Sequence, residues 1–254
     1  MKISDRYHLN RLRHIPRFIP GHIKLEGLII QFTDSLTLYY GYHDIFINNI
    51  YHFNSEKKDP VIIDLGGYIG LSVLYFKNIY PESLIHVFEP DPDLFNILQK
   101  NLCKNRISKV FPHNSGAGLH EEIKKFYPEK SGGGNPYNPS GTERINVNII
   151  KLSSFINGPT DFIKMNVEGM EYDILLEIES KLFLVRELVL EYHNFSSLPQ
   201  NMGNILNLLA RNGFNYMVRD IPSQRHSYHA ALDKDFKKFN LIYAKNQKDR
   251  RINK

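Results

Sequence analysis

Three glycines and an acid stand close together where an apolar run gives way to a helical pattern. Residues 61–65 are apolar enough for a buried strand, and Asp64, Gly66, Gly67 and Gly70 lie at its end. Glycine lets the backbone turn sharply and approach a ligand at the open edge of a parallel sheet. Dinucleotide sites have the spacing Gly-x-Gly-x-x-Gly, whereas an acid two residues before the first glycine suits a cationic ligand better than a diphosphate. The turn therefore predicts a site for a positively charged nucleoside.

A second carboxylate follows the next expected strand, at residues 84–88. Glu89, with Pro90 behind it, stands 25 residues after Asp64. A carboxylate at this place accepts two hydrogen bonds from a ribose diol in proteins that bind NAD or S-adenosylmethionine. The pair of acids favours S-adenosylmethionine, which carries a sulfonium and an ammonium but no phosphate. The alternative is that Asp64 caps its turn and Glu89 is a solvated strand end.

Small side chains follow the third expected strand, at residues 110–114. Ser115, Gly116 and Ala117 leave room beside the strand end for an adenine ring. Such a string is also common in ordinary loops. We interpret it as part of the same nucleoside site because it follows the third strand of the predicted sheet.

The strands and helices that would position these residues can be predicted from the sequence pattern after residue 59. Short apolar runs alternate with helix-length amphipathic stretches, which is typical of β-α units and a mostly parallel sheet. Further strands are predicted at residues 162–166, 187–192, 216–221 and 241–245, and helices at residues 70–79, 92–105, 170–181 and 202–212. Little helical periodicity separates the last two strands, so they should pair antiparallel. We expect an α/β fold with a doubly wound, Rossmann-like seven-stranded sheet and an antiparallel last strand.

Two segments lie outside this alternation. Residues 1–58 combine a basic start with apolar runs at 28–30, 36–40 and 45–53, which predict a β-rich extension before a domain of residues 59–254. An insertion at residues 120–156 interrupts the domain. It contains strand-like runs at 123–127 and 145–152 and a glycine-rich loop at 131–134, which is either a substrate lid or a surface loop.

Composition and charge narrow the class of protein. The 254 residues are 42% apolar and include one cysteine, Cys103, which excludes intrachain disulfides and cysteine-rich zinc sites. Residues 1–24 carry a net charge of +5 and residues 245–254 carry +4, whereas the body between them carries −4. Basic blocks at the ends argue against nucleic acid as a partner and leave solvated ends or contact with an anionic membrane surface. Without a membrane-spanning run or a signal core, we expect a cytoplasmic protein.

Four stretches of the sequence resemble the FkbM-type family of S-adenosylmethionine-dependent methyltransferases. They are residues 61–70, 88–90, 161–171 and 190–193, and the similarity covers roughly residues 28–245. The resemblance implies a class I methyltransferase fold and transfer of a methyl group to a hydroxyl oxygen, often on a sugar or a sugar-bearing natural product. The chain departs from the family where Gly67-Tyr68 replaces Ala-Asn and where Asn166 replaces aspartate.

The expected cofactor contacts follow from the turn, the two strand ends and the resemblance together. They are Asp64, Gly66, Gly67, Tyr68, Gly70, Glu89, Pro90, Ser115, Gly116, Ala117 and Asn166. A sugar hydroxyl must also lose its proton during methyl transfer, which needs a general base. Asn166 cannot serve, because an amide is not basic at neutral pH.

Three side chains near the same sheet edge are candidates for the base. Glu168 follows the fourth strand of the domain, and Glu191 and His193 end the neighbouring strand, where alternate residues face the same side. His193 is the first choice because the ordinary pKa of histidine, about 6.5, is close to working pH. The alternatives are a histidine bonded to the backbone and a Glu168 that interacts with the dipole of the helix it opens.

The predicted function is an S-adenosylmethionine-dependent O-methyltransferase that acts on a sugar hydroxyl of a glycan, glycolipid or glycosylated metabolite. Asn166 leaves open a catalytically silent protein that binds S-adenosylmethionine, and the glycine turn with Glu89 leaves open an NAD-dependent oxidoreductase. A magnesium ion held by Asn166, Glu168 and Glu191 is a weaker alternative. This hard cation prefers negatively charged oxygens, and residue 166 is an amide.

Overall fold

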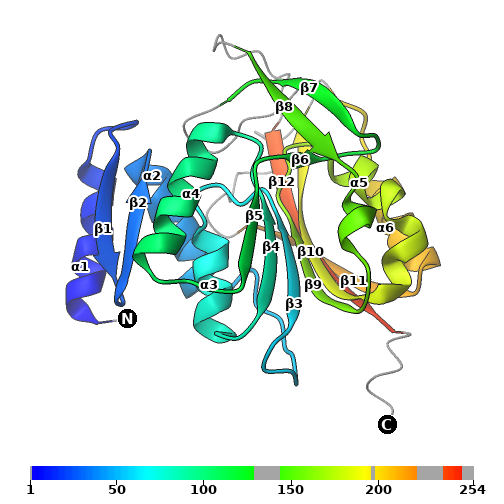
Figure 1. Ribbon diagram of the computed structural model, residues 1–254, viewed down its shortest axis with the longest axis horizontal. Coiled ribbons are helices and arrows are strands. Elements are labelled where there is room, and N and C mark those ends of the chain that lie inside the picture. Colours follow the sequence, from blue (N-terminus) through cyan, green and yellow to red (C-terminus); the bar gives the residue numbers. More distant parts are fainter. Residues whose placement is uncertain (1, 129–143, 196–197, 222–236, 248–254) are drawn as a thin grey trace.

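A seven-stranded sheet forms the centre of the computed structural model, which describes residues 2–128, 144–195, 198–221 and 237–247 (Figure 1). Its strands are β3 (Val61–Leu65), β4 (Leu84–Phe88), β5 (Val110–His113), β9 (Thr160–Met165), β10 (Val185–Phe195), β11 (Phe214–Asp220) and β12 (Lys237–Asn246). They lie in the order β11-β12-β10-β9-β3-β4-β5. β12 is antiparallel to β10 and β11, and the remaining pairs are parallel. The expected fold class and its antiparallel last strand are confirmed.

Helices cover both faces of this sheet (Figure 1). α3 (Leu71–Ile79) and α4 (Pro92–Lys104) lie on one face, and α5 (Glu171–Glu177) and α6 (Met202–Arg211) lie on the other. Each pair buries its apolar side chains in a separate core cluster with residues from the sheet. Asp91 caps α4, where its carboxylate accepts from the backbone N–H groups of Asp93 at 2.8 Å and Leu94 at 3.2 Å.

The N-terminal extension is more helical than the sequence pattern predicts. It contains α1 (Ile3–Arg11), β1 (Gly21–Leu25), β2 (Leu28–Phe32), α2 (Ser35–Tyr42) and a π-helical turn at His43–Ile47. The predicted strands at residues 36–40 and 45–53 are therefore wrong. Asp34 caps α2 by accepting from the Thr37 backbone N–H at 3.1 Å. Leu38, Tyr42 and Ile45 are buried at helical spacing, so one face of a helix enters the core where alternation had favoured a strand.

Side chains of α4 and of its C-cap residue hold the extension against the central domain. Asn105 accepts from the backbone N–H of Ile29 and Asn101 accepts from that of Gln31, both at 2.8 Å. The Asn101 amide also donates to the Ile69 carbonyl at 2.8 Å, in the turn between β3 and α3. Two asparagines one helical turn apart thus form hydrogen bonds with the backbone groups at the open edge of β2, which would otherwise be unpaired. The boundary predicted near residue 58 remains a prediction, because one core cluster draws on both sides of it.

Two strands of the insertion, β7 (Glu122–Phe126) and β8 (Ile145–Ile150), form a small sheet with β6 (Gly116–Ala117), which lies just before the insertion; the strand order is β6-β8-β7. Two of these strands coincide with the strand-like runs in the sequence. The glycine-rich loop at 131–134 and most of the basic C-terminal block lie outside the described residues. Across the described ranges, no helix combines the length and the apolar character needed to cross a membrane.

Candidate active site

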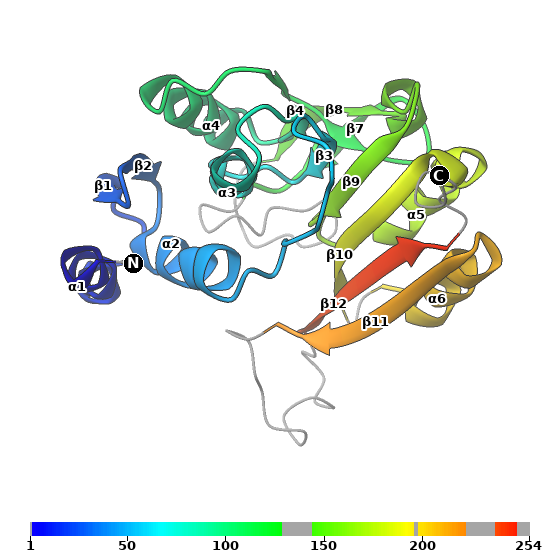
Figure 2. The same ribbon diagram turned by 90° about the horizontal axis from the view of Figure 1, so that it is seen from below.

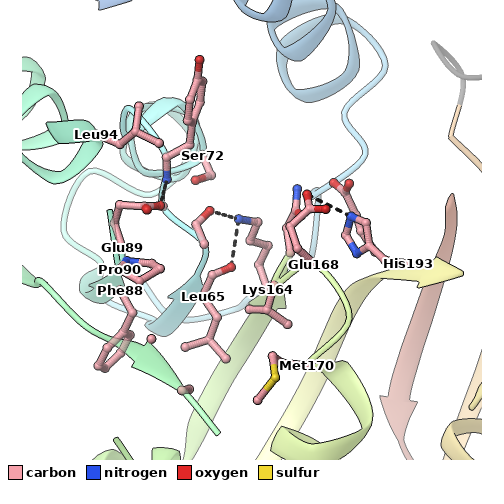
Figure 3. A pocket seen from close by; sticks show the side chains of 18 of the residues that line it. Leu65, Ser72, Phe88, Glu89, Pro90, Leu94, Lys164, Glu168, Met170 and His193 are labelled. Atoms are coloured by element: carbon pink, nitrogen blue, oxygen red, sulfur yellow. Dashed lines mark hydrogen bonds and ion pairs between the residues drawn. The ribbon is translucent and has the colours of Figure 1, made fainter. Parts of the chain in front are cut away.

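A cavity of about 440 Å³ lies at the carboxyl ends of β3, β4, β9 and β10. This volume is within the range of about 300–1,000 Å³ typical of ligand sites. Most of the predicted site residues line it: Gly66, Gly67, Tyr68, Glu89, Pro90, Ser115, Gly116, Ala117, Asn166, Glu168, Glu191 and His193. Asp64 and Gly70 do not. Figure 3 shows Glu89 on one side of the cavity, Glu168 and His193 on the other, and Lys164 between them.

The glycine turn joins the ends of β3 and β9 so closely that only glycine fits. Gly66 has a φ of +77°, and a Cβ atom there would lie 1.9 Å from the Asn166 carbonyl oxygen. Asn166 in turn donates its backbone N–H to the Leu65 carbonyl at 3.0 Å. A Cβ atom on Gly67 would lie 2.4 Å from Cγ2 of Val87. This packing explains why glycine stands at both positions, and it leaves backbone rather than side chains facing the cavity.

Glu89 is held by backbone hydrogen bonds in the cavity wall. Its Oε2 accepts from the N–H of Tyr68 at 2.7 Å and its Oε1 accepts from that of Asp91 at 2.9 Å. Burial raises the pKa of Glu89 to about 8, although these two donors act in the opposite direction. Tyr68 adopts the left-handed region with a φ of +49°, so its N–H can point at this carboxylate. The carboxylate is thereby fixed in orientation before any ligand binds.

Asp64 is paired inside the protein rather than presented to the cavity. Its side chain is fully buried, with Oδ1 3.0 Å from Nζ of Lys164 and Oδ2 accepting from the Ser72 hydroxyl at 2.5 Å. The same Lys164 ammonium donates to the carbonyls of Leu65 at 3.1 Å and Gly66 at 2.6 Å (Figure 3). Lys164 therefore balances the charge that the sequence analysis assigned to a cationic ligand. The sequence does carry a signal for this ion pair, because Lys164 stands within the otherwise apolar run that forms the second half of β9.

His193 lies between two carboxylates. Its Nε2 is 3.2 Å from Oε1 of Glu168 and its Nδ1 is 2.5 Å from Oε1 of Glu171, the first residue of α5. Burial alone would lower the pKa of His193, but the two negative charges outweigh it and hold that pKa well above its ordinary value. The two carboxylates therefore favour the protonated form of this imidazole. Glu168 has a φ of +53°, a strained conformation of the kind that gathers at functional sites.

Tyr51 connects the extension to the end of β10. Its hydroxyl donates to the Glu191 carboxylate, and its ring lies 5.5 Å from the Lys164 ammonium. Burial, followed by the charge of Glu191, raises the pKa of Tyr51 well above 10, and burial also raises the pKa of Glu191. Glu191 and His193 both line the cavity, as the alternation along β10 predicts. Tyr51 is not among the predicted site residues, because residues 45–53 are expected from the sequence to form a strand of a separate extension.

Metal ligation was considered for Asn166, Glu168 and Glu191. In the part of the chain that the structure describes, no three His, Cys, Asp or Glu side chains are grouped as a metal site. Glu168 contacts His193, and Glu191 contacts Tyr51. Both carboxylates thus take part in protein contacts at the cavity wall.

Comparisons with known proteins agree with this fold and identify the family. A family model for the methyltransferase FkbM domain matches residues 64–216. Methyltransferase 1 from Beauveria bassiana (strain ARSEF 2860) is 28% identical over 188 residues, which cover 60% of this chain and 76% of that protein. The 31-O-demethyl-FK506 methyltransferase FkbM from Streptomyces tacrolimicus is 23% identical over 221 residues, which cover 71% of this chain and 83% of the relative.

A solved structure shares the fold. The methyltransferase FkbM from Methylobacillus flagellatus KT superposes with a TM-score of 0.50 at 17% identity over 82% of this chain, which spans half the length of that protein. The family model covers more than half of the chain and includes the end of β3 from Asp64, the glycine turn, Glu89 and the β9–α5 stretch with Glu168 and Glu171. The chain therefore belongs to the FkbM methyltransferase family and is a methyltransferase.

Proposed function

We propose that the protein is an S-adenosylmethionine-dependent O-methyltransferase that methylates a sugar hydroxyl of a glycan, glycolipid or glycosylated metabolite. One observation carries the proposal: Glu89, held by two backbone N–H groups, and Glu168, in contact with His193, face the same cavity from opposite sides. The first suits a ribose diol, and the second suits an acceptor hydroxyl that must lose a proton. A relative whose name specifies a 31-O-methyl transfer supports oxygen as the acceptor atom.

The residues present fit the cofactor. Glu89 offers a pre-oriented acceptor for the two ribose hydroxyls, and the backbone of Gly66 to Tyr68 borders the cavity without Cβ atoms on its first two residues. Gly116 leaves space next to Pro90, since a Cβ atom there would lie 3.7 Å from Cβ of Pro90 and 2.9 Å from Ile149. We assign the adenine to this end of the cavity. Asp64 acts indirectly in this scheme, by holding Lys164 under the glycine turn.

Glu168, rather than His193, is the group we assign as general base. When bound, S-adenosylmethionine supplies a methyl carbon activated by a positive sulfur, so the protein has to align the acceptor and take up its proton. The two carboxylates beside His193 hold its pKa well above its ordinary value, which favours the protonated imidazolium over a ring that could accept this proton. Glu168 lines the cavity and retains 17% side-chain exposure, so its carboxylate is accessible to an acceptor hydroxyl. His193 is then the positioning residue for Glu168, fixed from behind by Glu171.

Isothermal titration with S-adenosylhomocysteine tests the cofactor assignment. Glu89→Ala should weaken binding at least tenfold, because hydrogen bonds to a charged group contribute about 1.5–3 kcal/mol. Glu56→Ala, an exposed carboxylate before β3, is the matched control and should bind like the wild type. Equal affinity of Glu89→Ala and the wild type would remove the ribose assignment.

Turnover tests the base and separates the two alternatives. With methyl-labelled cofactor and a panel of sugars, glycosides and glycolipids, Glu168→Gln should lower kcat by about 100-fold or more while leaving the affinity for S-adenosylhomocysteine within a few-fold. A protein that binds S-adenosylhomocysteine yet methylates no panel member would favour the silent alternative. Stabilisation by NAD and not by S-adenosylhomocysteine in a thermal shift assay would favour the oxidoreductase.

The expectations about location and partners accompany this proposal. A cytoplasmic location fits a small-molecule methyltransferase, and the described basic start, with exposed Arg6 and Arg11, is free to meet an anionic surface. Vesicle flotation with and without anionic lipid tests that contact. We expect no affinity for nucleic acid, because the excess positive charge lies in the two end segments, whereas the body between them carries a net charge of −4.

A further inference from the structure

A buried tyrosine from outside the family model contacts the cavity carboxylate Glu191. The family match begins at residue 64, whereas Tyr51 lies between the π-helical turn and β3. Figure 2 shows the chain leaving α2 and running toward β9 and β10 before it enters β3. Tyr51 is 3% exposed, lines the cavity and donates its hydroxyl hydrogen to Oε1 of Glu191. The extension therefore holds one carboxylate of the cavity wall in place.

Glu191 differs in its partners from the other acids at this edge of the sheet. Asp64 is paired with Lys164, and Glu168 is paired with His193. Within the described ranges, Glu191 forms no ion pair, and its carboxylate has one hydrogen bond, from Tyr51 to Oε1. Glu191 is 8% exposed and lines the cavity. Because burial of a carboxylate is costly unless its oxygens receive hydrogen bonds, Oε2 is available to a donor that enters the cavity.

An amide lies next to this carboxylate and narrows the kind of donor. β9 and β10 are paired up to Met165 and Leu190, so the residues that follow, Asn166 and Glu191, are neighbours. Asn166 lines the same wall, and its side chain is a second hydrogen-bond partner of the Tyr51 hydroxyl. A carboxylate only accepts hydrogen bonds, whereas an amide also donates them. A hydroxyl group, which donates one hydrogen bond and accepts others, matches this pair, while an ammonium group can only donate.

We propose that Glu191, held by Tyr51, binds a second hydroxyl of the acceptor, one that is not itself methylated. This inference rests on the proposed methyl transfer and deepens it, because the acceptor must then carry at least two hydroxyl groups. The reacting hydroxyl lies at Glu168 and the other at Glu191, at the ends of the adjacent strands β9 and β10. Two fixed points orient an acceptor better than one. Tyr51 is a positioning residue in this scheme, supplied by the extension.

Deoxygenated acceptors test the second hydroxyl. Methyl glucoside, methyl galactoside and methyl mannoside are compared with their monodeoxy derivatives, using methyl-labelled S-adenosylmethionine. For the parent that is methylated best, removal of one hydroxyl other than the reacting one should lower kcat/KM at least tenfold, because a buried carboxylate then loses its donor. Equal kcat/KM for the parent and every derivative that keeps the reacting hydroxyl overturns the inference alone. No transfer to any of the three parents overturns the sugar acceptor as well.

A Glu191 variant shows whether this residue recognises that hydroxyl. Glu191→Ala should lower kcat/KM for the parent at least tenfold and change it little for the deoxy derivative, so that the preference for the parent disappears. Its Kd for S-adenosylhomocysteine should stay within about twofold of the wild type. The matched control is Glu187→Ala, on the same strand but outside the cavity lining, where Glu187 is paired with Lys245 at 3.1 Å. It should keep the full preference.

A Tyr51 variant tests the positioning role with little loss of packing. Tyr51→Phe removes only the hydroxyl, so KM for the parent should rise by about threefold to tenfold while kcat changes less than about twofold. Tyr80→Phe, which loses a hydrogen bond to the Phe53 carbonyl at 3.0 Å outside the cavity lining, is the control and should leave KM unchanged.

Three results would overturn the inference. The first is a preference for the parent acceptor that is the same in the wild type, Glu191→Ala and Tyr51→Phe. The second is a loss of S-adenosylhomocysteine affinity of about tenfold or more in Glu191→Ala, which would assign Glu191 to the cofactor. The third is a fall in kcat without a change in KM in Glu191→Ala, which would make Glu191 the base. Failure of the wild type to bind S-adenosylhomocysteine would instead overturn the proposed function.

Discussion

Lys164 provides the sharpest test of how the site is held together. The perturbation is Lys164→Met, which keeps a long apolar side chain and removes the ammonium. That ammonium is 3.0 Å from Asp64 and donates to the carbonyls of Leu65 and Gly66, and Lys164 is only 2% exposed. The substitution therefore leaves a buried carboxylate without its cation and two turn carbonyls without their donor.

The expected magnitude follows from the distance and the burial. At 3.0 Å and an effective dielectric of about 20, Coulomb's law gives an attraction of about 5 kcal/mol. Breaking one partner of a buried pair costs about 3–5 kcal/mol, because the other charge remains buried. For a chain of 254 residues this lowers Tm by on the order of 10 °C. Affinity for S-adenosylhomocysteine should also fall, since Gly66 loses the contact that fixes the turn.

A double-mutant cycle separates the ion pair from simple loss of packing. The double variant Asp64→Asn/Lys164→Met lacks both charges. Its loss in free energy of unfolding should be smaller, by at least about 1 kcal/mol, than the sum of the losses in the two single variants. Chemical denaturation measures stability, and Lys100→Met, an exposed lysine of α4, is the control with a change within about 0.5 kcal/mol. A Lys164→Met protein within 1 kcal/mol of the wild type, with normal affinity for S-adenosylhomocysteine, would show that the ion pair does not hold the turn.

Three further predictions concern single residues. The pKa of His193 is raised on folding, so its stabilising effect is full below pH about 6.5 and is lost as pH rises through the folded value. The Tm gap between wild type and His193→Gln should therefore narrow from pH 6 to pH 10, and a widening gap contradicts the imidazolium assignment. Because Glu89 titrates at about 8, affinity for S-adenosylhomocysteine should rise by up to about tenfold per unit between pH 6 and 8, whereas Glu89→Gln should give a flat profile. Gly66→Ala should cost more than about 3 kcal/mol in unfolding experiments, because its Cβ would lie 1.9 Å from a carbonyl oxygen. Gly203→Ala, on α6 with open space around it, should instead add about 0.5–1 kcal/mol, and equal effects of the two substitutions would refute the clash.

The central sheet could be predicted from the sequence because its signals are local and strong. The apolar runs at 61–65 and 84–88 coincide with β3 and β4, and the glycines lie where the structure needs a positive φ or a close approach. Buried parallel strands read as continuous apolar runs, and proline and glycine mark their ends. The same locality explains why Glu89 and His193 were placed in the cavity wall by topology alone.

The extension and the site's ionic contacts could not be predicted in this way. Leu38, Tyr42 and Ile45 face the core only because α2 packs there, and aromatic and threonine residues at 37–42 favour a strand when taken alone. The partners of Asp64 and His193 come from other strands and helices. Sequence spacing shows which acids reach the sheet edge, but not which of them already has a cation beside it.

That distinction changes the chemistry assigned to each acid. Asp64 reaches the same edge as Glu89 but is neutralised by Lys164, so it stabilises the turn, while Glu89 keeps backbone donors only and remains available for a ligand. On the other side, the sequence favours His193 as the base, but in the structure its two ring nitrogens contact Glu168 and Glu171, which is why we propose Glu168 as the proton acceptor. In both cases a residue to which the sequence assigned a direct contact instead positions a neighbouring group: Asp64 positions the glycine turn, and His193 positions Glu168. We therefore assign the role of each carboxylate by two properties. The first is whether a buried cation already pairs with it, and the second is whether it faces the cavity.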